Sequence, residues 1–173
     1  MKNIELLFDA IRSPTDIANM IQLSLALDAT LYMTGNCVNY KIPKIWGKVG
    51  SWGITEEPKI IHDQSFENLV NKLKQQGKTL IGTSPNAKKN FYDLDLQNID
   101  PVFVFGTETS GLCAAKQKLL DEMVVLPMAP KMNFMTLSVC VPPIAYECHR
   151  IMRKTGGSAG TRTPDQSVMS APL

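Results

Sequence analysis

Short apolar runs that alternate with helical patterns are the feature that most limits how this sequence can fold. The apolar runs predict strands at Ile4–Phe8, Thr30–Met33, Lys59–His62, Thr79–Gly82, Val102–Phe105 and Met123–Leu126. The helical patterns predict helices at Pro14–Leu27, Ser65–Gln76 and Ile144–Arg153. Strands that alternate with helices are typical of an α/β fold, in which a mainly parallel sheet carries helices on both faces.

The first predicted helix has a well-marked start. Ser13 suits the N-cap, Pro14 suits the first helical position, and Asp16 stands where the acid of a capping box belongs. Apolar residues cover most of the circumference of this helix, at Ile17, Met20, Ile21, Leu23, Leu25 and Leu27. A helix of this kind is buried, either against the sheet or against a partner subunit.

Composition sets wide bounds on function. The 173 residues are most simply one domain, and a net charge of +2 is compatible with a nucleic-acid partner without implying one. No apolar run approaches the ~18 residues of a membrane span, and Glu5 interrupts the apolar N-terminus, so the sequence predicts a cytoplasmic protein. The four cysteines lack metal-site spacing, so we expect reduced thiols and no bound metal.

The composition changes beyond Lys154. The segment that follows contains the run G-G-S-A-G-T-R-T-P-D, which is small, polar and without periodicity. Such a composition is typical of disordered segments, because it cannot bury enough apolar surface to fold. We therefore expect one folded domain at residues 1–154 and a disordered tail at residues 155–173.

One predicted strand ends in an unusual turn, V-F-G-T-E-T-S-G-L at Val104–Leu112. Two glycines, Gly106 and Gly111, bracket the carboxylate of Glu108. Glycine allows positive φ and lets another group approach the backbone closely. In a parallel sheet, ligands usually bind at the carboxyl ends of the strands. The turn therefore marks a candidate binding site.

The motifs that accompany this turn follow a particular order. After G-T-E-T-S-G-L come V-V-L-P-M, then M-N-F-M-T-L-S-V, then I-A-Y-E-C-H-R, and upstream stands I-R-S-P-T-D-I-A-N-M-I-Q. The ordered set resembles the SpoU-like (TrmH-type) branch of the SPOUT class of RNA methyltransferases, which methylates ribose 2′-hydroxyls of tRNA or rRNA. The resemblance spans roughly residues 4–153.

The resemblance has consequences for fold, assembly and cofactor. It implies a C-terminal deep trefoil knot, which is an exception to the rule that chains are not threaded. It also implies a homodimer with its active sites at the subunit interface, S-adenosyl-L-methionine as the cofactor, and tRNA or rRNA as the substrate. The cofactor-binding positions carried over are Gly82, Thr83, Gly106, Leu126, Met128, Phe134 and Met135.

The catalytic positions carried over from the resemblance are Gln22, Glu108 and Thr136, and two of them depart from the family's pattern. Gln22 stands where the family has an arginine that assists deprotonation of the ribose hydroxyl, and Thr136 stands where it has an asparagine. Asp16 also replaces an asparagine, and Phe134 replaces a serine. A neutral glutamine can hydrogen-bond the hydroxyl but is not an effective base. The general base is therefore left open, and a catalytically weakened or inactive RNA-binding or scaffold protein of the same fold is the alternative function.

Two consecutive prolines, Pro142 and Pro143, stand where the family carries helix-forming residues. Proline removes a backbone donor and clashes inside a helix. We therefore expect the last helix to start late, with the two prolines in its first turn, or to be kinked there. Tyr146 and Glu147 match a Tyr-Glu pair of the family, and we expect them to pack this helix rather than to act in catalysis.

Basic residues supply the candidate RNA contacts, which are Arg12, Lys44 and Lys48. Lys41 belongs to the same patch as Lys44 and Lys48, and Tyr40 and Trp46 are interleaved with the three lysines. Stacking aromatic rings beside phosphate-binding cations are what single-stranded RNA requires. The alternative for this patch is an ordinary solvated loop.

Overall fold

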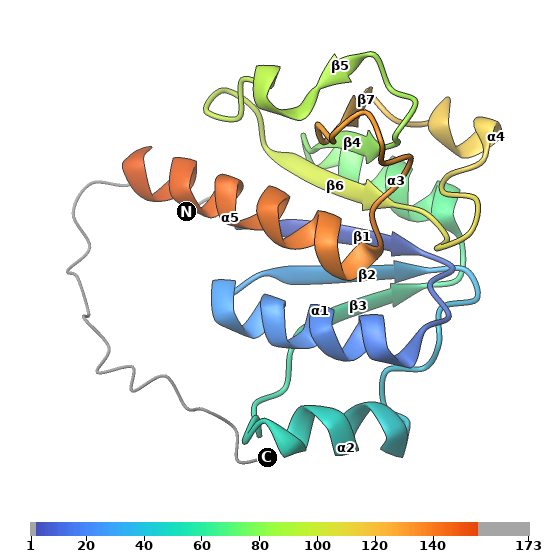
Figure 1. The fold of residues 1–173 in the computed structure, drawn as a ribbon, viewed down its shortest axis with the longest axis vertical. Helices are drawn as coiled ribbons and strands as arrows, with labels where there is room; N and C mark the ends of the chain where they lie inside the picture. The colour runs from blue at the N-terminus through green and yellow to red at the C-terminus, as the bar shows by residue number, and fades with distance from the viewer. Residues whose placement is uncertain (1–2, 156–173) are drawn as a thin grey trace.

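The computed structural model describes residues 3–155, which contain a single sheet of seven parallel strands. The strand order is β3-β2-β1-β6-β4-β7-β5 (Figure 1). The strands are β1 Glu5–Asp9, β2 Thr30–Thr34, β3 Lys59–Asp63, β4 Thr79–Thr83, β5 Lys89–Asn90, β6 Pro101–Phe105 and β7 Glu122–Val125. Every pairing between neighbouring strands is parallel, so the predicted sheet is confirmed.

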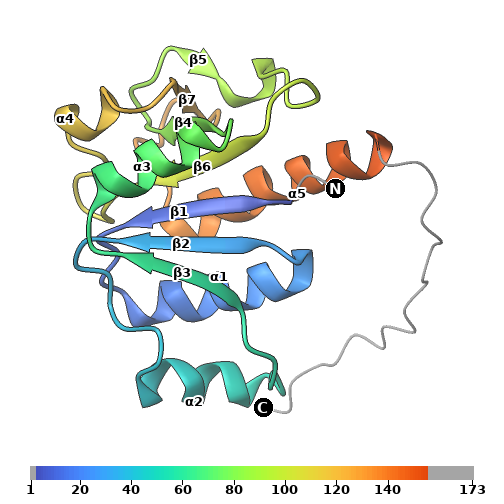
Figure 2. The same ribbon diagram turned by 180° about the vertical axis from the view of Figure 1, so that it is seen from behind.

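Helices cover both faces of this sheet, as predicted. They are α1 Pro14–Leu27, α2 Pro43–Ser51, α3 Phe66–Gln75, α4 Ala114–Gln117 and α5 Leu137–Thr155, with a short 3-10 helix, η1, at Phe91–Asp93. α1, α2 and α5 pack on one face of the sheet, and α3 packs on the other (Figure 1 and Figure 2). The chain is therefore a three-layer α/β structure.

Side-chain alternation along the strands separates two hydrophobic cores. Leu6 and Phe8 of β1 pack with the layer of α1 and α5, whereas Leu7 between them packs with α3. The Phe8 ring stacks on the Phe105 ring of β6, with centroids 5.5 Å apart. Every residue of β1 and β6 is buried, which is typical of central strands in a parallel sheet.

The parallel strands bring their carboxyl ends to one edge of the sheet. Phe8 pairs with Phe105 across β1 and β6, so the loops after these two strands start side by side. On the other side of β6, Gly82 of β4 pairs with Val104. The loops after β1, β4, β6 and β7 therefore meet at this edge, which is where ligands bind in open parallel sheets.

The predicted strands and the first two predicted helices are confirmed to within one residue at each end. The sequence analysis missed α2, α4 and β5. α2 buries only Ile45 and Val49, and α4 and β5 span four and two residues, so none of them leaves a strong periodic signal.

The predicted late start of the last helix is wrong, because α5 begins at Leu137 and contains both prolines. The alternative, a kink at the prolines, stays a prediction. The Thr136 carbonyl accepts the backbone N–H groups of Val139 and Cys140, both at 3.0 Å, and so starts the helix ahead of the prolines. An apolar stripe then packs α5 into the core, formed by Leu137, Val141, Ile144, Ala145 and Cys148. Burial of this stripe outweighs the two missing N–H donors.

Two absences hold for the described part of the chain. None of the helices in residues 3–155 is both long enough and apolar enough to cross a membrane. The same residues contain no group of three or more His, Cys, Asp or Glu side chains that could hold a metal ion. The predicted tail after Thr155 lies outside the described residues.

Pro143→Ala is expected to raise the free energy of unfolding by about 1–2 kcal/mol. Alanine supplies an N–H donor for the carbonyl of Val139, and Pro143 is exposed, so little packing is lost. The gain stays below the ~3 kcal/mol cost of an interior proline because proline also restricts the unfolded chain. Urea unfolding of the two proteins measures the difference. A less stable variant would contradict the expectation.

Candidate functional site

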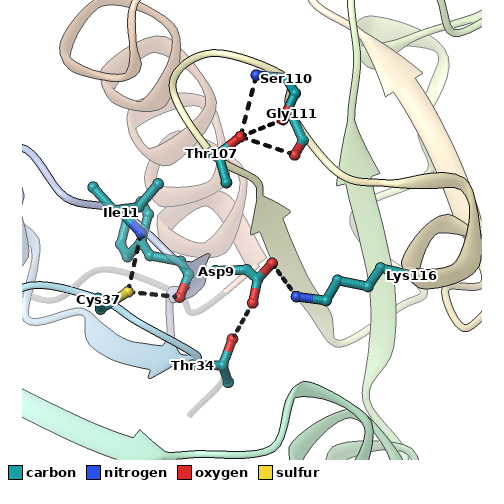
Figure 3. A network of polar contacts seen from close by, with 9 residues as sticks. Asp9, Ile11, Thr34, Cys37, Thr107, Ser110, Gly111 and Lys116 are labelled. Atoms are coloured by element: carbon teal, nitrogen blue, oxygen red, sulfur yellow. Dashed lines mark hydrogen bonds and ion pairs between the residues drawn. The ribbon is translucent and has the colours of Figure 1, made fainter.

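The loop that follows β6 closes on itself as a tight turn. The Gly111 N–H donates to the Thr107 carbonyl at 2.9 Å, and the Thr107 N–H donates to the Gly111 carbonyl at 3.2 Å. Thr107 Oγ1 accepts from the Ser110 N–H at 3.1 Å and lies 2.8 Å from Ser110 Oγ (Figure 3). Glu108 therefore lies within a turn whose two ends are fixed to each other.

Gly106 is required by the closure of this turn. A Cβ at this position would lie 2.2 Å from the Gly111 carbonyl carbon and 2.4 Å from the Leu112 nitrogen. Gly111 has a φ of +65°, a left-handed conformation that favours glycine. The sequence predicts two uses for these glycines, positive φ and the close approach of another group, and Gly111 confirms the first. The structure shows that backbone of the turn itself approaches Gly106 most closely.

The Glu108 carboxylate joins this turn to the start of α1. Its Oε1 accepts the backbone N–H groups of Arg12 and Ser13, both at 3.0 Å. Ser13 Oγ in turn accepts the Asp16 N–H at 3.2 Å, which confirms Ser13 as the N-cap. The acid of a capping box would accept the Ser13 N–H from within the helix. Here an acid 95 residues away accepts it.

The Asp16 side chain consequently does not complete the predicted capping box. Its Oδ1 accepts the hydroxyl of Ser138, at the start of α5, and the Asn19 amide donates to the same Ser138 Oγ at 3.0 Å. These contacts join α1 to α5 directly after Thr136. Sequence reasoning missed them because Asp16 and Ser138 are 122 residues apart and no local pattern links them.

The three candidate catalytic residues lie in different places within one chain. Glu108 is in the turn, and Thr136 is exposed just before α5. Gln22 is exposed on α1, in a groove of about 360 Å³ between α1 and α5 that Tyr146 also lines. Gln22 stands nine positions after Ser13, which is about 13 Å along the helix from the contact with Glu108. One chain alone does not bring Gln22 to the turn.

The candidate cofactor positions fall into two groups. Those at or just after the carboxyl ends of β4, β6 and β7 are Gly82, Thr83, Gly106 and Leu126, and the sheet brings them together. Those in the segment between β7 and α5 are Met128, Phe134 and Met135. The Phe134 ring is 62% exposed, so in one chain it does not fill the space at the strand ends.

An ion pair between a buried carboxylate and a half-buried lysine lies beside the turn (Figure 3). Asp9, at the end of β1, is 2% exposed, and its Oδ2 lies 2.5 Å from Lys116 Nζ of α4. Thr34 of β2 donates to Asp9 Oδ1 at 2.9 Å. The Lys116 ammonium also lies 4.9 Å from the centroid of the Phe66 ring. The pair fixes α4 to the central strands. It thereby also fixes the end of the turn at Gly106–Gly111, called the Gly106 turn below. The sequence analysis did not single out Asp9 or Lys116.

The loop after β2 packs against the loop after β1. The Ile11 N–H donates to Cys37 Sγ at 3.2 Å, and Cys37 Sγ donates to the Phe8 carbonyl at 3.4 Å (Figure 3). The Val38 N–H donates to the Ile11 carbonyl at 2.8 Å. Burial raises the pKa of the Cys37 thiol, so it stays a neutral donor at physiological pH.

The remaining cysteines behave as the sequence predicts. All four cysteines of the chain are free. Burial raises the pKa of Cys140 to about 11 and the pKa of Cys148 to about 12. These two thiols are therefore protonated and unreactive at neutral pH.

The candidate RNA contacts come from the loop after β1 and from α2. Arg12 is exposed next to the Glu108 contact, and Lys44 is exposed in the first turn of α2. Lys48 follows one helical turn later, with its Nζ 5.4 Å from the centroid of the Trp52 ring. Trp46 is half-buried and packs against the core, so its ring is not a free stacking surface.

The sequence matches the SpoU rRNA methylase family over residues 3–146. This chain belongs to that family. It is 26% identical over 147 residues to an uncharacterized tRNA/rRNA methyltransferase of Synechocystis, covering 84% of this chain and 52% of that protein. It is 23% identical over 145 residues to the 23S rRNA (guanosine-2′-O-)-methyltransferase RlmB of Pseudomonas putida, covering 84% and 58%. The chain thus spans little more than half the length of these two SpoU relatives.

Another relative is similar over most of its own length. A Bacillus subtilis protein, whose name assigns it provisionally as a tRNA (cytidine(34)-2′-O)-methyltransferase, is 30% identical over 145 residues, covering 79% of this chain and 86% of that protein. Among solved structures, the SpoU methyltransferase AviRb from Streptomyces viridochromogenes, in complex with AdoMet, has a TM-score of 0.74 at 23% identity, covering 90% of this chain and 62% of AviRb. The likeness to AviRb confirms the α/β fold with its mainly parallel sheet.

Glu108→Ala is expected to lower the free energy of unfolding by about 1–2 kcal/mol, because two N–H groups at the start of α1 lose their acceptor. Glu108→Gln keeps an acceptor oxygen and should lose less. Thermal and urea unfolding measure both variants. Glu57→Ala, which removes an exposed acid elsewhere, is the matched control. If the Glu108→Ala and Glu57→Ala variants are equally stable, the contact of Glu108 with the Arg12 and Ser13 N–H groups does not stabilise the fold.

Lys116→Met is expected to cost about 3 kcal/mol of stability, because it leaves the buried Asp9 carboxylate without its cation. Asp9→Asn combined with Lys116→Met should recover part of this loss, since no uncompensated charge then remains. Urea unfolding gives the comparison, and Lys118→Met, at an exposed position just after α4, is the control. If both lysine variants unfold at the same urea concentration, the ion pair does not hold α4 in place.

Proposed function

We propose that this chain is an S-adenosyl-L-methionine-dependent RNA 2′-O-ribose methyltransferase that acts on tRNA or rRNA. The observation that carries the proposal is the contact of Glu108 with the N–H groups of Arg12 and Ser13. It fixes the family's glycine turn at the strand ends where a cofactor would bind. Membership of the SpoU rRNA methylase family supports the same activity.

The residues at the strand ends fit such a cofactor. The half-buried side chains of Leu126, Met128 and Met135 offer apolar surface for an adenine ring. The loops that start after β4 and at Gly106 offer backbone polar groups at the same edge. S-adenosyl-L-methionine would supply an electrophilic methyl group there, and its sulfur would keep the electron pair of the broken C–S bond.

The chain's own residues must then align the ribose and remove a proton. The 2′-oxygen forms the new O–C bond in line with the leaving sulfur, and the hydroxyl proton leaves as this bond forms. Gln22 can orient the hydroxyl through a hydrogen bond but cannot take its proton. Asp16, the carboxylate that contacts Ser138, is a group at the α1–α5 junction that can accept the proton.

The proposed enzyme is a homodimer. In one chain, Gln22 lies about 13 Å along α1 from the Glu108 contact, so a second copy must present its own α1 for Gln22 to act at the turn. The groove between α1 and α5, with Tyr146 and Val139 exposed on α5, is the surface proposed for this contact. The location proposed for the dimer is the cytoplasm.

The proposed fold includes the deep trefoil knot of the family at the C-terminal end. The strand order supports it, because β7 lies between β4 and β5 while α5, which follows β7, packs against α1 at the other half of the sheet. The chain must therefore cross the carboxyl edge, close to the Gly106 turn, between β7 and α5 (Figure 1).

A second candidate function keeps the fold and the RNA contact without methyl transfer. Neutral side chains at Gln22 and Thr136 favour it, since they stand where the family carries a catalytic arginine and asparagine. The protein would then be an RNA-binding or scaffold subunit.

Calorimetric titration with S-adenosyl-L-methionine and a transfer assay on unmodified tRNA and rRNA transcripts test these functions. We expect micromolar binding and incorporation of the methyl group at ribose 2′-hydroxyls. Gln22→Arg together with Thr136→Asn should raise the transfer rate by about tenfold or more. Gln75→Arg with Thr55→Asn, at exposed positions away from the site, is the matched control. Absence of cofactor binding by a folded protein would leave the scaffold function as the better account.

A further inference from the structure

A second hollow lies at the same edge of the sheet, away from the Gly106 turn. It is formed by the residues after β2 and the end of β3 and has a volume of about 390 Å³. Its lining includes Asn36, Asn39, Tyr40, His62 and Gln64. The volume is near the lower end of the roughly 300–1,000 Å³ of small-molecule sites, which suits one ring system rather than an extended ligand.

The polar groups of this hollow carry no fixed charge. Among the described residues that line it, none is Asp, Glu, Lys or Arg. A side-chain amide offers a donor and an acceptor side by side, which is the pattern that the edge of a nucleobase presents. Tyr40 is half-buried against the core, as Trp46 is, but unlike Trp46 it lines the hollow, where the accessible part of its ring can contact a base. The lining therefore matches an uncharged heterocycle better than a phosphate or a carboxylate.

The amides are free to bind. Asn36 and Gln64 are exposed, and within residues 3–155 neither side-chain amide makes a hydrogen bond. Asn39 Oδ1 accepts the Lys41 N–H at 2.9 Å, which orients the Asn39 side chain and leaves its NH₂ group as a donor. The hollow thus holds polar groups that the fold itself does not use.

The surroundings of the hollow supply positive charge. Lys41 Nζ lies 5.7 Å from the centroid of the Tyr40 ring, and Lys44 follows in the first turn of α2. Both lysines are exposed. A base placed in the hollow would leave its phosphates in the solvent beside these cations, where they would be attracted.

The hollow and the Gly106 turn are both hydrogen-bonded to the loop that follows β1. Cys37, which lines the hollow, and Val38 are hydrogen-bonded to Ile11. The next residues along the chain, Arg12 and Ser13, hold Glu108 of the turn. The loop at residues 10–13 therefore connects the hollow to the Gly106 turn.

We propose that this hollow binds one unpaired nucleobase of the RNA, next to the nucleotide whose ribose is methylated. The proposal rests on the proposed methyltransferase function for the identity of the ligand. The Asn36, Asn39 and Gln64 amides hydrogen-bond the edge of the base, Tyr40 contacts its face, and Lys41 and Lys44 attract the adjoining phosphates.

Fluorescence anisotropy with a short single-stranded RNA of random sequence tests the site without cofactor. An abasic ribose-phosphate strand of the same length is the second probe. The wild-type protein should bind the RNA more tightly than the abasic strand. Asn36→Ala with Gln64→Ala should weaken RNA binding roughly five- to tenfold and leave abasic-strand binding unchanged. Tyr40→Leu should cause a loss of similar size, about fivefold or more.

The control variant carries Asn71→Ala with Gln75→Ala, which removes one Asn and one Gln amide from the exposed surface of α3. It should bind both strands like the wild type. Circular dichroism and unfolding confirm that each variant is folded. Equal RNA affinities of the pocket variant and the control variant would overturn the proposal. So would a wild-type protein that does not distinguish RNA from the abasic strand, or that binds neither.

Failure of the proposed function has a different signature. Suppose that the folded wild-type protein neither binds S-adenosyl-L-methionine nor transfers a methyl group, and that the Asn36→Ala, Gln64→Ala variant still loses base-dependent RNA binding. This result would support the nucleobase site and contradict the methyltransferase function. If the pocket variants transfer the methyl group at the wild-type rate when RNA is limiting, the methyltransferase function is supported and the nucleobase site is contradicted.

Discussion

Two backbone N–H groups at the start of α1 and one carboxylate after β6 hold the candidate site together. The N–H group of a helix N-cap has no partner within the helix. Here Glu108 accepts that of the N-cap Ser13 and that of Arg12, the residue before it. The contact joins the loops after two neighbouring central strands, β1 and β6. Because the Gly106 turn is closed by its own hydrogen bonds, fixing Glu108 positions the turn as a rigid unit. The candidate residues of the turn and of α1 are therefore positioned relative to each other by this join.

The ion pair between Asp9 and Lys116, at the same edge of the sheet, also holds the loops of the candidate site in place. Asp9 is buried at the end of β1 and is neutralised by Lys116, so α4 is fixed to the sheet just after the turn ends. A buried ion pair adds little net stability, but separating its partners is costly. The pair therefore favours one placement of α4 over others. Glu108 and Lys116 thus hold the chain between β6 and α4 in place. Glu108 contacts the loop after β1, and Lys116 contacts Asp9 at the end of β1.

Local patterns in the sequence predicted the elements whose signals are local. α1 is an example, since Ser13, Pro14 and a nearly continuous apolar surface all indicate the same helix. α5 is the opposite case, because Pro142 and Pro143 argue locally for a late start while burial of Val141 and Ile144 decides otherwise. Glu108 was found through its motif. The contacts of Glu108 with Arg12 and Ser13 could not be predicted in this way, because they join segments about a hundred residues apart. Periodicity and capping rules do not connect such segments.

The candidate site separates positioning from proton removal. Every contact that holds the turn, the start of α1 and the start of α5 is present within one chain. Gln22 lies away from these contacts. It is uncharged and lines the groove between α1 and α5, about 13 Å along α1 from the contact with Glu108. Under the proposed function, Gln22 can orient the ribose hydroxyl but cannot take its proton. The proton must then pass to a carboxylate such as Asp16, or to a group that a second copy brings to the groove.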